Sequence, residues 1–191
     1  MRVITLAILF VSLPAHGGAD WREPSKVISH LDLTSGSSAA VIGAGGAYLV
    51  PRVSKALGPS GKLYLIDSDP ALIQNFERTI ESERLTNTTV VLSPTAKPHI
   101  PQQLDLILVV NGYRYLDRRE SYFETLKRHL TSKGRVVVID FYRRPMRIGP
   151  PLKERVASHR VMKELDRFGF RLAKRYNILP YQYFLVFAPK A

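Results

Sequence analysis

The chain has 191 residues, of which 45% are hydrophobic and 23% are charged, and its formal net charge is +12. This length and composition suit one well-buried domain and leave too little chain for two large ones. The sequence contains no cysteine, which excludes a disulfide framework, a thiolate metal site, a cysteine nucleophile and a lipid-modified cysteine.

Residues 1–19 have the pattern of a secretory signal peptide. Arg2 precedes an apolar run from Val3 to Leu13, and small residues follow up to Ala19. That run is shorter than the roughly 20 residues that a membrane-spanning helix needs. We therefore predict an exported protein, periplasmic or secreted, whose domain covers residues 20–191. The alternatives are a loose N-terminal anchor on a cytoplasmic or membrane-associated protein, and a buried first strand.

The next part of the chain predicts one short helix and then a series of strands. Pro24 stands near the start of the helix, which has Val27, Ile28 and Leu31 at helical spacing. The apolar runs that follow are nearly continuous in their apolarity, as in strands that are covered on both faces of a parallel sheet. These runs cover residues 39–43, 62–67, 88–93, 104–111 and 134–141.

Helical patterns separate these runs. The first covers residues 47–57, and the second begins at Asp69, an N-cap acceptor that precedes a proline. The third begins near Asp117 and places Leu130 inward, and the fourth covers about 152–168. Strand and helix alternate in this way in a doubly wound α/β sheet with right-handed crossovers.

Two further β-rich runs, at about 170–177 and 181–188, end the chain. They are joined through Leu179 and Pro180, with no room for a helix between them. Because a parallel crossover needs about a dozen residues, the two runs must pair as an antiparallel hairpin.

A glycine-rich turn, VIGAGGAY at residues 41–48, lies between the first strand and the helix after it. Glycines let the backbone approach a cofactor and expose N–H groups at a helix N-terminus. Asp67 ends the second strand, where a carboxylate can accept both hydroxyls of a ribose. Tyr48 stands where a dinucleotide fingerprint needs glycine or alanine, which counts against NAD.

From Trp21 onward the chain resembles the class I S-adenosylmethionine-dependent methyltransferases. The resemblance rests on the order of elements, the closing hairpin and three segments, at residues 41–70, 104–116 and 130–141. It implies a Rossmann-like sheet of seven mostly parallel strands, and methyl transfer from bound S-adenosyl-L-methionine.

The same resemblance assigns the cofactor site. It implies that Gly43, Ala44 and Gly45 form a backbone bed for the methionine half of the cofactor, and that Asp67, followed by Ser68, contacts the ribose. Asn111 falls beside the methyl group.

The chain also departs from the family pattern at several positions. Val41 stands where members usually have an acid, and Ala47 where they have a third glycine. Near the adenine, Ser93 and Thr95 stand in place of an acid. In place of the histidine pair of the most similar subgroup, the chain has Arg114 and Tyr115.

Methyl transfer needs donor and acceptor held in line, and a base helps when the acceptor is a hydroxyl or an amine. The base candidates are Tyr113 and Tyr115, with Asp140 as a third. Aromatic packing is the structural alternative for the two tyrosines, and a hydrogen bond to the backbone is the alternative for Asp140.

Positive charge gathers late in the chain: between Asp140 and Arg175, eleven Lys or Arg residues stand against four Asp or Glu. Such a field favours an anionic acceptor or an anionic membrane surface. Arg143, Arg144 and Arg147 follow the fifth strand, at the edge where doubly wound sheets bind ligands. No aromatic ladder accompanies this charge, which disfavours nucleic acid. His30, His99, His129 and His159 show no i, i+4 pair, so we predict no metal.

The resemblance, together with these patterns, implies an S-adenosylmethionine-dependent methyltransferase that acts on a small molecule or surface component. The alternative is a non-catalytic protein of the same fold, whose basic face binds a partner or an anionic membrane.

Overall fold

The computed structural model describes residues 20–94 and 98–190. The predicted signal peptide at residues 1–19 and the predicted adenine contact of Thr95 lie outside the described residues. Among those residues, no helix is long and apolar enough to span a bilayer.

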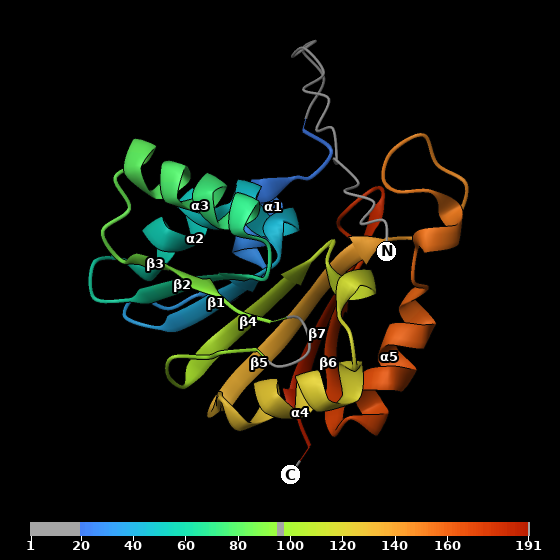
Figure 1. Cartoon of the computed structure of the whole chain (residues 1–191). Helices are drawn as coiled ribbons and strands as arrows, with labels where there is room; N and C mark the ends of the chain where they lie inside the picture. Colours follow the sequence, from blue (N-terminus) through green and yellow to red (C-terminus); the bar gives the residue numbers. More distant parts are fainter. Residues whose placement is uncertain (1–19, 95–97, 191) are drawn as a thin grey trace, which may run out of the picture.

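Helices and strands alternate along most of the described chain (Figure 1). The strands are β1 (Ser38–Ile42), β2 (Lys62–Asp67), β3 (Thr88–Leu92), β4 (Leu104–Val110), β5 (Leu130–Phe141), β6 (Phe170–Tyr176) and β7 (Gln182–Pro189). The α-helices are α1 (Pro24–Ser29), α2 (Val50–Leu57), α3 (Pro70–Ser82), α4 (Arg119–Arg128) and α5 (Ser158–Arg167). Short 3-10 helices are η1 (Ala44–Leu49), η2 (Tyr113–Tyr115) and η3 (Leu152–Glu154).

The strands form one seven-stranded sheet in the order β3-β2-β1-β4-β5-β7-β6. The first five strands of this order pair in parallel, whereas β7 runs antiparallel to both β5 and β6. The predicted α/β class, the doubly wound sheet and the closing hairpin are therefore confirmed.

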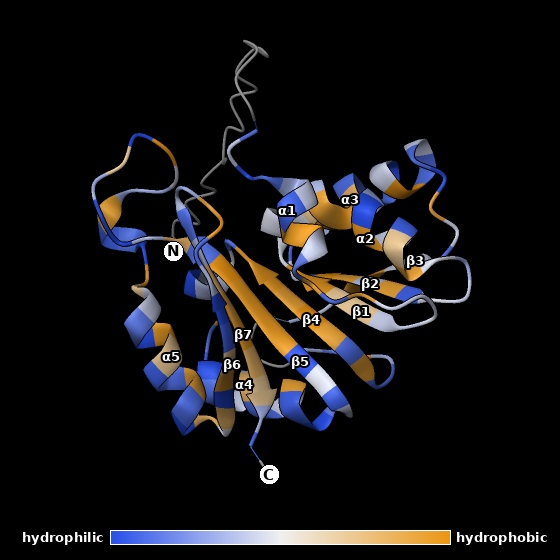
Figure 2. Ribbon diagram, turned by 180° about the vertical axis from the view of Figure 1, so that it is seen from behind, coloured by the Kyte–Doolittle hydropathy of each residue, from blue (hydrophilic) through white to orange (hydrophobic). Residues whose placement is uncertain are grey.

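The two faces of the sheet are covered by different helices. Side chains of α1, α2 and α3, including Val27, Val53 and Phe76, pack on one face. Side chains of α4 and α5, including Phe123 and Leu165, pack on the other. The central strands are hydrophobic along most of their length (Figure 2), because both of their faces lie against helices.

Several predicted helices are shorter than their patterns suggested. Leu31 lies beyond the end of α1, and residues 47–49 belong to η1 instead of α2. Leu130 is buried as predicted, but it begins β5, because α4 already ends at Arg128. The predicted helix at 152–168 divides into η3 and α5, and the backbone at Arg155 and Ala157 is extended. The guanidinium of Arg155 turns inward to backbone carbonyls of the preceding loop, so this turn cannot continue as a helix.

Candidate functional site at the carboxyl edge of the sheet

The glycine turn leaves β1 at the carboxyl edge of the sheet. Gly43 has a φ of 83°, in the left-handed region that favours glycine. Its N–H donates to the carbonyl of Ile66, 2.9 Å away, which ties the turn to β2. A Cβ at Gly43 would meet nothing within 4 Å, so its exposed side is open to a ligand. Ala44 then begins η1, which leads directly into α2.

Gly45 is required for a different reason, which is its close approach to β4. A Cβ at this position would lie 2.1 Å from the carbonyl oxygen of Val110 and 2.8 Å from the Cβ of Asn111. Real side chains do not tolerate such distances, so the glycine turn can pack onto β4 only without a side chain here.

Replacing Gly45 by alanine should therefore lower the free energy of unfolding by about 2 kcal/mol, the usual effect of overpacking a close contact. Urea unfolding would measure the loss. Gly112→Ala is the matched control, since its Cβ would lie no closer than 3.7 Å to a neighbour. Equal stability of the two variants would contradict this account of Gly45.

Asp67 ends β2 and begins the turn into α3. Its Oδ1 accepts hydrogen bonds from the N–H of Ser68 at 2.7 Å and of Asp69 at 3.0 Å. Asp69 caps α3 as predicted, because its side chain accepts from the N–H of Ala71 at 2.8 Å. The structure shows no hydrogen bond to Oδ2 of Asp67 from any described residue, and this second oxygen can accept a ligand hydroxyl.

Asn111 follows β4 with a φ of 53°, a conformation that asparagine tolerates better than most residues. Its N–H donates to Ile139 of β5 at 2.8 Å, and its Oδ1 accepts from Nε2 of Gln182 at 2.7 Å. Gln182 is fully buried, and its Oε1 has no partner in the described structure. No local pattern in the sequence points to Gln182, because only the antiparallel return of β7 brings it beside Asn111.

Tyr113, one of the two predicted catalytic bases, is a fully buried core residue. Its hydroxyl donates to Oε2 of Glu164 at 2.6 Å, which joins η2 to α5. Glu164 also accepts from Arg160 at 2.7 Å and pairs with Arg119 at 3.5 Å. Burial and the hydrogen bond to Glu164 raise the pKa of Tyr113 well above its usual value. The structure thus places this hydroxyl in a network of hydrogen bonds and ion pairs with Glu164, Arg160 and Arg119.

Tyr115, the second predicted base, is 52% exposed. Its hydroxyl accepts from Nη2 of Arg114, whose guanidinium carbon lies 4.2 Å from the centre of the tyrosine ring. The inner nitrogens of Arg114, Nε and Nη1, are buried without a hydrogen-bond partner among the described residues.

Asp140, the third base candidate, is 2% exposed near the end of β5. Its Oδ1 accepts from the N–H of Phe141 at 2.7 Å, as the structural alternative predicted. Its Oδ2 is buried and has no partner among the described residues. Burial raises the pKa of Asp140 to about 6, against the lowering effects of that backbone hydrogen bond, of Arg114 and of the N–H of Tyr113.

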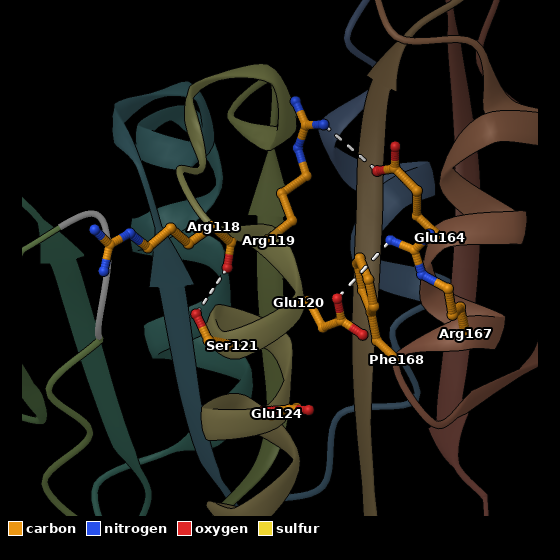
Figure 3. A pocket seen from close by; sticks show the side chains of 8 residues that line it. All are labelled: Arg118, Arg119, Glu120, Ser121, Glu124, Glu164, Arg167 and Phe168. Carbon is orange, nitrogen blue, oxygen red and sulfur yellow. Dashed lines mark hydrogen bonds and ion pairs between the residues drawn. The ribbon is translucent and has the colours of Figure 1, made fainter.

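The groove in Figure 3 lies elsewhere, between α4 and α5. It has a volume of about 470 Å³, and its walls carry ion pairs such as Arg119 with Glu164 and Arg167 with Glu120. None of the residues predicted for the cofactor or for catalysis lines it.

The model of the ubiE/COQ5 methyltransferase family matches residues 9–185 of the chain. The chain belongs to the ubiE/COQ5 methyltransferase family. A protein-L-isoaspartate O-methyltransferase from Methanococcus maripaludis is 34% identical over 70 residues, which cover 37% of this chain and 33% of that relative. The chain therefore matches about a third of the length of this curated relative.

Solved structures of methyltransferases share the fold of this family member. A SAM-dependent methyltransferase from Aquifex aeolicus superposes with a TM-score of 0.80 at 24% identity, over 86% of this chain and 88% of that one. A glycopeptide N-methyltransferase, solved with the S-adenosylmethionine analogue sinefungin, has a TM-score of 0.70 at 10% identity, over 94% and 90% of the two chains. Membership of this methyltransferase family indicates S-adenosylmethionine as the cofactor, and these neighbours show the shared fold.

The carboxyl edge of the sheet fits that cofactor. The open side of Gly43 lets a ligand approach the backbone, and Asp67 has a carboxylate oxygen to offer the ribose. Asn111 lies against Gly45, and its side chain accepts a hydrogen bond from Gln182. The Oε1 of Gln182 has no partner among the described residues. The contact of Ala44 with the methionine half and the contact of Ser68 with the ribose stay predictions. Both residues are assigned only because they neighbour Gly43 and Asp67 in the chain.

Proposed function

We propose that this protein transfers a methyl group from S-adenosylmethionine to an acceptor bound at the carboxyl edge of the sheet. One observation carries the proposal. Gly43, Asp67 and Asn111 follow or end β1, β2 and β4, which are adjacent in the order β2-β1-β4. Because parallel strands end at one edge, the three residues lie along the crevice where doubly wound folds bind ligands.

When bound, S-adenosylmethionine supplies a methyl group activated by its sulfonium sulfur. The chain's own contribution is to hold donor and acceptor in line, which accounts for much of the catalysis in such transfers. We assign the backbone of Gly43, Ala44 and Gly45 to the methionine half, Asp67 and Ser68 to the ribose, and Asn111 to the region of the methyl group.

The basic residues after β5 support an anionic acceptor as the finer proposal. Arg143 and Arg147 are exposed on the loop that follows β5. Arg144 is tied down, since its Nη2 donates to the carbonyl of Pro180 at 2.9 Å. An anionic group near this loop would gain from the positive field.

Replacing Asp67 by alanine should weaken S-adenosylmethionine binding by about ten- to a hundredfold, the effect of losing a hydrogen bond to a charged group. Isothermal calorimetry of the full chain measures this. Asp69→Ala is the matched control, because it removes the cap of α3 and should lower stability by about 1 kcal/mol with little change in affinity. Unchanged affinity in Asp67→Ala would place the ribose elsewhere. Binding without any methyl transfer would favour the non-catalytic alternative.

A further inference from the structure

Two oppositely charged groups lie next to the proposed methyl site with unused hydrogen-bonding atoms. Asp140 has one buried carboxylate oxygen without a partner, and Arg114 has two buried nitrogens without one, within the described part of the chain. The charge of Arg114 acts on Asp140, yet the two side chains form no hydrogen bond that the structure shows.

Burial of this kind is costly for a fold. A buried carboxylate is destabilising unless its oxygens are paired, and natural structures leave few such atoms unmatched. The N–H of Phe141 donates to Oδ1, and the N–H of Tyr113 lies close enough to the carboxylate to lower its pKa, but neither nearby tyrosine hydroxyl is available to Oδ2. Tyr183 lies directly opposite on β7, but its hydroxyl donates to the carbonyl of Val156 at 3.2 Å. Tyr113, beside Arg114, gives its hydroxyl to Glu164.

The position of the pair indicates which ligand meets it. Asp140 is near the end of β5, and Arg114 is in η2, three residues after Asn111. β4 and β5 are neighbours in the sheet, and Asn111 lies against Gly45 of the glycine turn. The pair therefore lies on the side of Asn111 toward β5, where an acceptor would approach a methyl group held over β4.

We propose that Asp140 and Arg114 bind the methyl acceptor and that the acceptor group is a hydroxyl. Arg114 donates to the hydroxyl oxygen, and Oδ2 of Asp140 accepts its proton. This inference rests on the proposed methyltransferase function.

The transfer balances with these groups. As the acceptor oxygen forms its bond to the methyl carbon, the sulfur–carbon bond breaks and its electron pair stays on sulfur. The hydroxyl proton moves to Oδ2 of Asp140 and is later released to water. A carboxylate near the operating pH is an effective base for such a step.

Other acceptor groups fit the pair less well. A carboxylate has no proton for Asp140 and would be repelled by its charge. A protonated amine would be repelled by Arg114 and has no electron pair for the methyl group. A hydroxyl both donates and accepts a hydrogen bond, which matches a free carboxylate oxygen and a free guanidinium nitrogen.

Phenol, with S-adenosylhomocysteine present, is a direct probe of this site. We expect phenol binding, followed by NMR titration of the full chain, to weaken about tenfold or more in Asp140→Asn and in Arg114→Gln, because each loses a hydrogen bond to a charged group. Arg118→Gln, an exposed arginine of the neighbouring turn, should bind phenol as the wild type does. Benzoate and toluene should bind more weakly than phenol.

A purely structural role for Asp140 would not produce the expected pH profile. Phenol affinity of the wild type should fall as the pH is lowered through about 6, and Asp140→Asn should show no such step. The groups that face Asp140 are Arg114 and Tyr113 from η2 and Tyr183 from β7, with Arg119 of α4 and Glu164 of α5 behind the tyrosines. Burial raises the pKa of Tyr113 and of Tyr183, and hydrogen bonds from Tyr113 and Arg160 lower the pKa of Glu164, so these three groups move away from pH 6.

The outcomes separate this inference from the proposed function. Equal phenol affinity in the wild type and Asp140→Asn, no phenol binding, or tighter binding of benzoate would overturn the hydroxyl site. Should calorimetry detect S-adenosylmethionine binding in that case, the methyltransferase proposal would stand alone. If phenol binding depends on both residues but S-adenosylmethionine does not bind, the hydroxyl site would stand and the methyltransferase proposal would fail.

Discussion

Replacing Arg155 by methionine is expected to lower the free energy of unfolding by about 4 kcal/mol, since it removes four hydrogen bonds worth about 1 kcal/mol each. The side chain of Arg155 is 5% exposed. It donates to the carbonyls of Pro150 and Arg144 at 2.7 Å, of Ile148 at 3.1 Å and of Tyr142 at 3.4 Å. One guanidinium thus holds together the loop that follows β5.

Urea unfolding of Arg155→Met measures this loss, and hydrogen exchange shows whether residues 142–150 open first. Methionine keeps most of the apolar stem, so the variant tests the hydrogen bonds more than the packing. Lys153→Ala is the matched control, because Lys153 is exposed two residues away and should change stability by less than about 0.5 kcal/mol. A loss below about 1 kcal/mol in Arg155→Met would show that the loop does not depend on this side chain.

Replacing Asp140 by asparagine is expected to change how stability depends on pH. Burial raises the pKa of Asp140 from 3.8 to about 6. Between these two pH values the folded protein binds the proton more strongly than the unfolded chain does, so wild-type stability falls as the pH rises. A difference of about 2 pH units corresponds to about 3 kcal/mol.

We compare the unfolding free energy of Asp140→Asn with that of the wild type at pH 4 and at pH 7.5. Relative to the wild type, the variant should be more stable at pH 7.5 than at pH 4 by about 3 kcal/mol. This double difference cancels the fixed cost of burying the new amide. Asp105→Asn serves as a control at the opposite edge of the sheet, because both of its oxygens are paired, with Ser38 and Thr131 at 2.9 Å. That variant should gain no stability at pH 7.5. A pH-independent difference for Asp140→Asn would contradict a raised pKa.

Local patterns in the sequence were enough to predict the sheet. Continuous apolarity located β1, β2, β4 and β5, because strands covered on both faces have no polar side. Asp69 and the proline after it located the start of α3, since capping is a local interaction. The end of the third predicted helix was missed because Leu130 is apolar and buried in either state, and apolarity alone does not separate the last turn of a helix from the first residue of a strand.

The candidate site was only partly predictable, because it depends on contacts between distant residues. The glycine turn and Asp67 follow from local sequence. The burial of Tyr113 depends on Glu164, which is 51 residues away, and the pairing of Asn111 depends on Gln182, which is 71 residues away. Aromatic residues after a strand fit a core and a site equally well, so the sequence could not show that Tyr113 is buried and held by Glu164.

Direct titration of the full chain with S-adenosylmethionine tests the central claim, that the carboxyl edge of this sheet is a working cofactor site. The chain has Val41 where the family pattern has an acid, but the backbone of Gly43 and the carboxylate of Asp67 are in place. We therefore expect binding heat that saturates at or below about 1 mM ligand and diminishes in Asp67→Ala. An absence of heat from the folded wild-type protein at that concentration, with both S-adenosylmethionine and S-adenosylhomocysteine, would contradict the claim.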